Sequence, residues 1–573
     1  TVSSSVTDSS GTRLTQRDEV SLRGTLISRT QTTTRNLPDG GQEILVETYL
    51  PDGKRSNVRT VYNPSNKDAG SGRIKFQQNA DGTVRLYTYI AAKDANGKPD
   101  GSWTVIEEQG VGTQSGVTDG TRKRVHFNTH GILDSEITED ISTQKQIASR
   151  RATVIDDAGR ATSWIYNEDK SDTSSITYGC CGISSERMRD GTEKFYSYDN
   201  AKRLVATTTK TGTRIEETST IRNGLTTEQF RKVNGAMVKV GESTSDLTGR
   251  VTTSSSIAAN TTNFDLEQVM TITEAIAGGG VRTTTINPDG STDISETYAD
   301  GQPKRSVQKS GWATQLETIY FRGTHNERGG GMWQEQRQNG VRWSRSYTGL
   351  GGTQLKQEQP TFGGAGVATT TYEFDSIGRV VKVTPPSGAP ILTSYNNKGE
   401  VYQTVQDNDN SGTITPADRV TRSTRESVSG VTLGNQSFGA GILQTSSVLN
   451  DAGNEVVLSR QWRSFDGLIS ASESRGLVSV SIREKPNSLE SKSTTYGADG
   501  TWQEQISRNG LPVESISYEA GSGSVLRHLI MGYDSQWRRN QQTERRHIGG
   551  KWVDFTTITT FYDSGQVKSV TTP

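Results

Sequence analysis

The residues best suited to a chemical task form the twelve-residue stretch DNDNSGTITPAD, residues 407–418. Its spacing matches the calcium-loop pattern D-x-[DN]-x-[DNS]-G-x5-[DE], in which one short loop wraps oxygen atoms around a hard cation. Gly412 would make the sharp turn. The expected ligands are Asp407, Asp409, Ser411, the carbonyl of Thr413, Thr415 directly or through water, and Asp418. The pattern predicts a calcium site; a solvated Asp/Asn turn that binds nothing is the alternative.

The segments flanking this loop, EVYQTVQ and RVTRSTRESV, have the pattern of strands. We therefore expect a loop between two strands and not a helical EF-hand; dockerin-like calcium loops look similar. With three carboxylates and a closing Asp in place of Glu, the expected affinity is about 10⁻⁴–10⁻³ M, the range of extracellular modules. This affinity predicts a structural staple instead of a calcium sensor.

The other residues with chemical potential favour ordinary structural roles. His126 and His130 have a spacing that places metal ligands together on a helix, but their segment reads as a strand. Five tryptophans suit either sugar stacking or, more commonly, cross-strand packing: Trp103, Trp333, Trp343, Trp502 and Trp552. The sequence contains no HExxH, GxSxG or phosphate-loop motif, and most of its aspartates lie in turns. We therefore expect no catalytic residue and no enzyme activity.

Two cysteines, Cys180 and Cys181, are adjacent in YGCCG. Neighbouring cysteines cannot join distant segments, so a disulfide scaffold is excluded. The favoured interpretation is a pair of free thiols in a tight turn. The alternative is a strained vicinal disulfide, which requires an oxidising compartment.

The bulk composition excludes several partners. The 573 residues carry 64 basic and 64 acidic side chains, which gives no electrostatic basis for binding nucleic acid or an anionic membrane. No apolar run approaches the ~20 residues that span a bilayer. The first residues, TVSSSVTDSSGTRL, do not form a signal peptide, and the last ones fall inside a repeat. We expect the chain to be a piece of a longer protein.

Internal repetition is the strongest feature of the sequence. The stretch TTTYEFDSIGRVVKVTPP, residues 369–386, has a degenerate copy in TTFYDSGQVKSVTTP, residues 559–573. Similarly, NLPDGGQEILVETYLPDGKRS (residues 36–56) returns as NPDGSTDISETYADGQPKRS (residues 287–306), and GMWQEQRQNG (residues 331–340) returns as GTWQEQISRNG (residues 500–510). So many partial copies indicate an array of one small unit.

The unit reads as strand, tight turn, strand. In YEFDSIGRVVKV, Tyr372 and Phe374 share one strand face, and Asp375 suits an Asx-type turn. Gly378 provides the positive φ of that turn, and Arg379 can reach back to a carboxylate. Asp-Gly and Asn-Gly pairs predict further hairpin turns: Asp39-Gly40, Asp52-Gly53, Asp81-Gly82, Asp119-Gly120, Asp190-Gly191, Asn223-Gly224, Asn339-Gly340, Asp466-Gly467, Asp499-Gly500 and Asn509-Gly510.

These units predict an all-β fold, a continuous array of hairpin repeats in a long curled or spiralling sheet, because a flat sheet would expose its edges. Residues 142–155 alone permit a short helix. Two blocks are expected, residues 1–306 and residues 307–573, the second containing the calcium-type loop. They would form one continuous array cut from a longer precursor.

The motifs YEFDSIGRVVKV, FYSYDNAKRLVA and GYDSQWRRNQ resemble the YxxDxxGR unit of Rhs/YD-repeat proteins. The hairpins PDGSTDISETYADGQPKRS and the YGCCG turn are similar to segments of that family as well. The resemblance covers most of the chain in degenerate form. It implies a spiralling β-sheet, often a hollow shell or cocoon, in a large protein that is secreted or displayed on the cell surface.

The resemblance implies a structural function: a shell, fibre or stalk, with self-association into a fibre as one form of partnership. One alternative is a toxin-encapsulating shell whose cargo lies beyond residue 573. Toxin-bearing members end in a DPxGL-type motif followed by a toxin domain, and the given sequence contains neither. A second alternative is a carbohydrate-binding or carbohydrate-cleaving protein that uses the tryptophans and paired acids.

Overall fold

The computed structural model describes residues 2–8, 13–22, 24–49, 55–65, 70–233, 235–258, 264–361, 366–548 and 550–573. In these ranges, 44 strands belong to one sheet, and the strands β34 (Val431–Leu433) and β35 (Gln436–Phe438) form a separate hairpin. Two single 3-10 turns are the only helical elements described. None of the described helices has the length and apolarity needed to cross a membrane. The predicted all-β array is confirmed.

The strands group into two compact units. The first comprises residues 1–161, 318–466 and 473–476, and the second comprises residues 162–317, 467–472 and 477–573. Each unit therefore combines stretches of chain that are far apart in the sequence. The predicted division between residues 306 and 307 stays a prediction.

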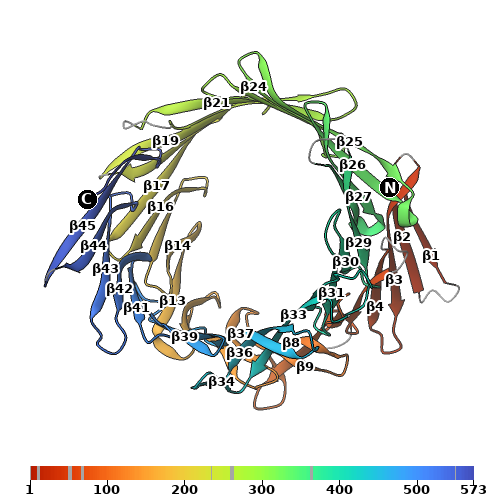
Figure 1. The fold of residues 1–573 in the computed structure, drawn as a ribbon, viewed down its shortest axis with the longest axis horizontal. Coiled ribbons are helices and arrows are strands. Elements are labelled where there is room, and N and C mark those ends of the chain that lie inside the picture. The colour runs from red at the N-terminus through yellow and green to blue at the C-terminus, as the bar shows by residue number, and fades with distance from the viewer. Residues whose placement is uncertain are drawn as a thin grey trace. The chain divides into compact units, whose positions relative to one another are not determined.

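In Figure 1, the first unit is drawn in red to orange for its first stretch and in green to blue for its second. The strands of the first stretch are β1 (Val2–Thr7), β2 (Arg13–Leu22), β3 (Thr25–Asn36), β4 (Gln42–Tyr49), β5 (Arg55–Tyr62), β6 (Ile74–Gln78), β7 (Val84–Lys93), β8 (Pro99–Thr113), β9 (Gly116–Phe127), β10 (Leu133–Asp140) and β11 (Gln146–Ile155). The second stretch contains the end of β25 (Ala313–His325), then η1 (Glu327–Gly329), β26 (Gly331–Gln338), β27 (Val341–Gly349), η2 (Leu350–Gly352), β28 (Gln354–Pro360), β29 (Val367–Phe374), β30 (Val380–Thr384), β31 (Ile391–Tyr395), β32 (Val401–Gln406), β33 (Arg419–Val428), β34, β35, β36 (Gly441–Leu449) and β37 (Glu455–Ser464).

The second unit is built in the same way. Its first stretch contains β12 (Ala161–Tyr166), β13 (Asp169–Gly179), β14 (Gly182–Arg187), β15 (Glu193–Tyr198), β16 (Leu204–Thr211), β17 (Arg214–Asn223), β18 (Thr226–Val233), β19 (Ala236–Ser245), β20 (Val251–Ile257), β21 (Leu266–Ala275), β22 (Val281–Ile286), β23 (Thr292–Thr297) and β24 (Pro303–Ser310). Its later strands are β38 (Ile469–Ser474), β39 (Leu477–Glu484), β40 (Glu490–Tyr496), β41 (Trp502–Arg508), β42 (Leu511–Tyr518), β43 (Val525–Tyr533), β44 (Arg539–Ile548), β45 (Lys551–Phe561) and β46 (Val567–Thr571).

The predicted Asx turn of the repeat is confirmed at residues 375–379. The Asp375 Oδ1 atom accepts hydrogen bonds from the backbone N–H groups of Ile377 (3.0 Å) and Arg379 (2.9 Å), and its Oδ2 atom accepts one from Arg379 Nε (2.7 Å). Gly378 has a φ of +86°, the left-handed conformation that the turn requires. A single carboxylate thus closes the turn and pairs with the arginine.

The same turn recurs in both units. Asp156, Asp199 and Asp534 each accept two backbone N–H bonds and one arginine Nε bond in the pattern of Asp375. Lys202 and Trp537 occupy the position of Gly378 with φ angles of +61° and +63°. The turn therefore survives without glycine, which explains why the sequence copies are degenerate.

In several hairpins a tyrosine hydroxyl bonds to a backbone carbonyl of the neighbouring hairpin. The hydroxyl group of Tyr395 donates to the carbonyl of Val380 at 2.9 Å, and the guanidinium of Arg379 lies 4.3 Å from the Tyr395 ring centre. Tyr198 donates to the carbonyl of Ile183 in the same way at 2.9 Å. At these positions, adjacent hairpins are therefore connected by a side-chain bond in addition to the backbone ladder.

The hydrophobic cores are small, as the low apolar content predicts. One cluster consists of Val61, Phe76 and Val84, and a second consists of Tyr347, Leu355 and Phe374. Between such clusters the sheet faces carry polar residues and cross-strand ion pairs. Stability must therefore be distributed along the array, as in other repeat proteins.

Most predicted Asp-Gly and Asn-Gly turns are present, with positive φ at the glycine. Asp119-Gly120 is a correction: it lies inside strand β9 and not in a turn. There Gly120 pairs with Gly110 of β8, and an added Cβ at Gly120 would lie 2.0 Å from the Gln109 carbonyl oxygen. The permitted helix at residues 142–155 is also wrong, because β11 occupies most of it. Asp52-Gly53 lies outside the described residues.

Candidate functional site

The candidate calcium loop connects two paired strands, as predicted. Gln406 at the end of β32 pairs with Arg419 at the start of β33, so residues 407–418 form the whole connection. Gly412 has a φ of +72° and Asn410 a φ of +55°, which bend the chain back on itself. The hairpin ladder therefore fixes both ends of the loop.

Asp407 anchors the loop from inside. It is fully buried, at 0% exposure, and its backbone N–H donates to the Pro390 carbonyl at 2.8 Å. Its Oδ1 accepts from the Ser411 N–H and its Oδ2 from the Gly412 N–H, both at 2.9 Å. Asp407, the first residue of the loop, is thus hydrogen-bonded to the backbone of the fifth and sixth residues, Ser411 and Gly412.

Two further carboxylates converge on Asp407. One oxygen from each of Asp407, Asp409 and Asp418 lies within 4.8 Å of the other two. The Thr415 hydroxyl is 2.8 Å from Asp409 Oδ2 and 3.1 Å from Asp418 Oδ2. The Ser411 hydroxyl donates to the Thr413 carbonyl at 2.9 Å, so these two expected oxygen ligands are also adjacent. The structure therefore brings the predicted ligand residues into one loop.

The chemistry of this donor set fits calcium. Hydrogen bonds from Thr415 and Ser411 lower the pKa of Asp409 to about 2, so it is ionised at neutral pH. Among the described residues, none of the three aspartates forms an ion pair with a lysine, arginine or histidine. Calcium takes six to eight oxygen ligands, including carboxylates, carbonyls and water. Asp407, Asp409, Ser411, Thr413, Thr415 and Asp418 would hold the ion.

A polar cavity adjoins the loop. Gly412, Thr413 and Ile414 form one wall of a hollow of about 570 Å³, and residues of β29 to β32 and of the turn after β29 line the rest. Tyr395 is the only aromatic residue among the lining residues described, and Arg379 already covers its ring. The cavity therefore lacks the open aromatic face on which a sugar would stack.

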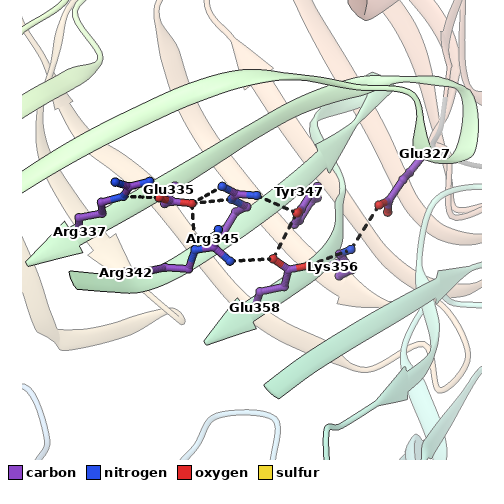
Figure 2. A network of polar contacts seen from close by, with 8 residues as sticks. All are labelled: Glu327, Glu335, Arg337, Arg342, Arg345, Tyr347, Lys356 and Glu358. Carbon is purple, nitrogen blue, oxygen red and sulfur yellow. Dashed lines mark hydrogen bonds and ion pairs between the residues drawn. The ribbon is translucent and has the colours of Figure 1, made fainter. Parts of the chain in front are cut away.

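A second polar site lies in strands β26 to β28, and Figure 2 shows it. Glu335 has no exposed side-chain surface and contacts three guanidinium groups. Its carboxylate is 2.5 Å from Arg337 Nε, 3.0 Å from Arg342 Nε and 2.7 Å from Arg345 Nε. A register shift between Gln336 and Arg337 lets both Arg342 and Arg345 reach the same carboxylate.

The network continues to strand β28. Arg345 donates to the Tyr347 hydroxyl (3.4 Å), which donates to Glu358 Oε2 (3.2 Å), and Lys356 pairs with Glu358 at 3.0 Å. Trp333 lies beneath Arg345, with 4.6 Å from the guanidinium to the ring centre. Glu335 and Glu358 are thus both paired with cationic side chains. The network connects strands β26 to β28, and neither carboxylate is free to act as an acid or a base.

The burial and the ion pairs act on Glu335 in opposite directions. Burial raises its pKa, but hydrogen bonds from Arg337 and Arg345 outweigh that effect and hold the pKa below its ordinary value. The sequence analysis missed this site. The alternation Trp333, Glu335, Arg337 marks one strand face, but nothing in the sequence indicates which strands bring the other two arginines.

The remaining candidate residues have structural partners. Trp103 stacks on Phe127 with ring centres 4.3 Å apart, and Trp502 stacks on Tyr518 at 4.9 Å. Trp552 contacts His547 at 5.3 Å, while Trp343 is 58% exposed. His126 lies 2.6 Å from an Asp134 carboxylate oxygen in a strand, which is not a metal-ligand arrangement with His130. The predominance of cross-strand packing agrees with the sequence analysis.

Comparison with known proteins yields only structural neighbours. No family model and no curated protein matches the sequence. The chain is similar to solved chains described as TcdB2-TccC3-Cdc42 (12% identity, 98% of this chain, 35% of that chain, TM-score 0.41) and as the Photorhabdus luminescens Tc holotoxin pore with the TccC3-D651A mutation (12%, 98%, 34%, TM-score 0.40). A third neighbour is TcdB2-TccC3 without its hypervariable C-terminal region (12%, 98%, 34%, TM-score 0.40). This chain spans about a third of their length.

Proposed function

We propose that this chain is a structural segment of an Rhs-type β-repeat wall, secreted or displayed on the cell surface, with no enzyme activity of its own. The observation that carries the proposal is a similar separation along the chain, 287 to 315 positions, between distant residues that are hydrogen-bonded to each other. A sheet that winds into a wall needs such a spacing, because each hairpin must contact the hairpin that follows it by one complete turn of the winding.

Four long-range hydrogen bonds give this spacing, and in one of them the donor is the backbone N–H of Phe264. In the first unit, Ser427 donates to the buried Asp140 at 2.6 Å across 287 positions. In the second unit, the corresponding separations are 299, 305 and 315 positions. These three bonds join Phe264 to Asp563, Arg231 to Gln536 and Asn487 to Asp172. The offsets in the two units are similar, as a regular winding of the chain would produce.

We further propose that the wall encloses a toxin domain encoded elsewhere in the same protein, which makes the cargo its partner. A sheet whose successive turns contact each other leaves few unpaired strand edges for the addition of another molecule. Such a sheet suits enclosure better than open polymerisation. A fibre, a stalk and a carbohydrate-binding adhesin are the competing outcomes, and each predicts a different particle or ligand.

Electron microscopy of the protein as isolated from its source, in calcium buffer, tests this proposal. We expect discrete hollow particles. Continuous filaments would replace the shell with a fibre, and solid particles would overturn the enclosure. A glycan array is expected to give no hits; specific hits that vanish on substitution of the exposed Trp343 would favour the adhesin instead.

We propose in addition that the 407–418 loop binds calcium as a structural staple between β32 and β33. The convergence of the Asp409 and Asp418 carboxylates on the buried Asp407 supports it. Such an ion would offset two of the three negative charges and fix the loop against the sheet. At a calcium concentration of about 10 mM, the expected affinity corresponds to about 1.4–2.7 kcal/mol of stabilisation.

Asp409→Asn is the sharpest test of this staple. The amide keeps an oxygen for the Ser411 N–H and a donor for the Thr415 hydroxyl, so the metal-free loop should hardly change. We expect the wild type to melt at a higher temperature in calcium buffer than in buffer with a chelator. In the variant, this difference between the two melting temperatures should largely disappear. As a control, Asp94→Asn in an ordinary Asx turn should behave alike in both buffers. An equal calcium response in wild type and Asp409→Asn would contradict the metal site.

A further inference from the structure

The two cysteines occupy the tip of a tight hairpin. Gly179 at the end of β13 pairs with Gly182 at the start of β14, so Cys180 and Cys181 alone connect the strands. Their Sγ atoms are 2.8 Å apart, Cys180 is exposed and Cys181 is half-buried. Both sulfurs therefore face each other at a position that a small reagent in solvent can reach.

The base of this turn is held independently of the sulfurs. Tyr198 of β15 donates its hydroxyl to the Ile183 carbonyl at 2.9 Å, and its ring lies against Gly182, where a Cβ would be 3.0 Å from the hydroxyl oxygen. Gly182 itself has a φ of +144°. A change at the sulfurs is therefore confined to the two-residue tip, since the strands beneath it have their own ties.

Composition leaves each thiol one possible partner in the chain. The 573 residues contain two cysteines, so any intramolecular disulfide must join Cys180 to Cys181. Contact with the Cys180 thiol raises the pKa of Cys181, and the nearby Asp199 adds to this while Lys202 opposes it. The two sulfurs thus share hydrogen bonding, so that a thiolate formed on one is solvated by the thiol of the other.

We propose that the Cys180–Cys181 turn is a redox modification site at which a low-molecular-weight disulfide oxidises the adjacent thiols to a vicinal disulfide. One cysteine thiolate attacks a sulfur of the small disulfide and expels the first small thiolate. The second cysteine then loses its proton, attacks the mixed disulfide at the first cysteine and expels the second small thiolate. The cysteine pair loses two electrons and two protons, and the small disulfide becomes two thiols.

The resulting bond should be reversible. Neighbouring Cα atoms across a trans peptide lie about 3.8 Å apart. Most disulfides bridge Cα atoms about 4.4–6.8 Å apart, and departures from that geometry store strain that makes the bond easier to reduce. Strained and exposed disulfides are the labile, regulatory class. We therefore expect a bond that responds to its redox environment, in contrast to a permanent structural bridge.

The test is intact-mass spectrometry of the full chain after incubation with oxidised glutathione. The mass of the wild type should fall by two hydrogen atoms, with no glutathione attached. A mild dithiol reductant should restore the two hydrogen atoms. Cys180→Ser and Cys181→Ser each lack the second thiol, so each should accumulate a stable glutathione adduct. Circular dichroism of all three proteins should be the same, because the strands below the tip have separate ties.

Three outcomes would overturn the proposal. The wild type stays reduced under conditions that modify both single variants, or it retains the glutathione adduct, or it forms disulfide-linked dimers. A trivalent arsenical that binds paired thiols gives a second readout. It should bind the reduced wild type, but neither the oxidised wild type nor either single variant. Equal binding to wild type and variants would show that the two thiols do not act as a pair.

Discussion

Glu335→Gln should be among the most destabilising substitutions in this chain, at a cost of about 3–5 kcal/mol. Glutamine preserves the shape of the side chain but removes the charge that three guanidinium groups share. Glu335 has no exposed side-chain surface, and the three arginine side chains are 21–42% exposed, so solvent can replace the lost partner only in part. Arg337, Arg342 and Arg345 would then repel one another in a partly solvated site.

Urea unfolding measures this effect, and an exposed ion pair provides the control. Glu490 pairs with Arg508 at 2.9 Å, and both side chains are 59% exposed. Exposed pairs contribute only about 0–1 kcal/mol, so Glu490→Gln should hardly move the urea midpoint. If the two substitutions have equal effects, the buried network does not stabilise the sheet.

The pH dependence gives the network a second signature. The ion pairs hold the pKa of Glu335 below its ordinary value of 4.5. A carboxylate with a depressed folded pKa contributes stability above its unfolded pKa and loses it as the pH falls through the folded value. The wild type should therefore lose stability below about pH 4.5, and Glu335→Gln should lose less over the same range.

The local features of this fold could be predicted from the sequence because their causes are local. Asp375, Gly378 and Arg379 lie within five positions, and the turn they form depends on little else. The calcium-type loop is predictable for the same reason, since all its candidate ligands lie in residues 407–418. Turn chemistry of this kind acts over a few residues, and each copy in the array repeats it.

The features that could not be predicted depend on distant pairing. The sequence around Glu335 does not reveal that a register shift brings Arg342 and Arg345 to its carboxylate. The contact of Asp140 with Ser427 depends on 287 intervening residues. Asp119-Gly120 has the composition of a hairpin turn, yet pairing with β8 places it in a strand. In each case the decisive partner is set by strand register, which the repeat pattern does not encode.

Gly120→Ala is the second substitution with a large expected effect. Gly120 has a φ of +149°, and a Cβ there would lie 2.0 Å from the Gln109 carbonyl oxygen of the neighbouring strand. Backbone strain of about 1–3 kcal/mol and a similar overpacking cost predict a loss of about 2–6 kcal/mol. We expect a lower urea midpoint and faster amide hydrogen exchange in β8 and β9. Unchanged exchange would contradict the close approach of these two strands.

Gly116→Ala is a matched control four positions away in the same strand, because a Cβ at Gly116 meets no atom within 4 Å. It should have little effect or slightly stabilise the chain by restricting the unfolded state.

Gly110 faces Gly120 across the two strands and has the equivalent contact: a Cβ at Gly110 would lie 2.0 Å from the Asp119 carbonyl oxygen. Either alanine alone must push β8 and β9 apart. The double variant Gly110→Ala/Gly120→Ala should therefore cost less than the sum of the single variants, since one separation of the strands accommodates both methyl groups. Additive costs would mean that each glycine serves only its own backbone conformation, and that the approach of the two strands is incidental.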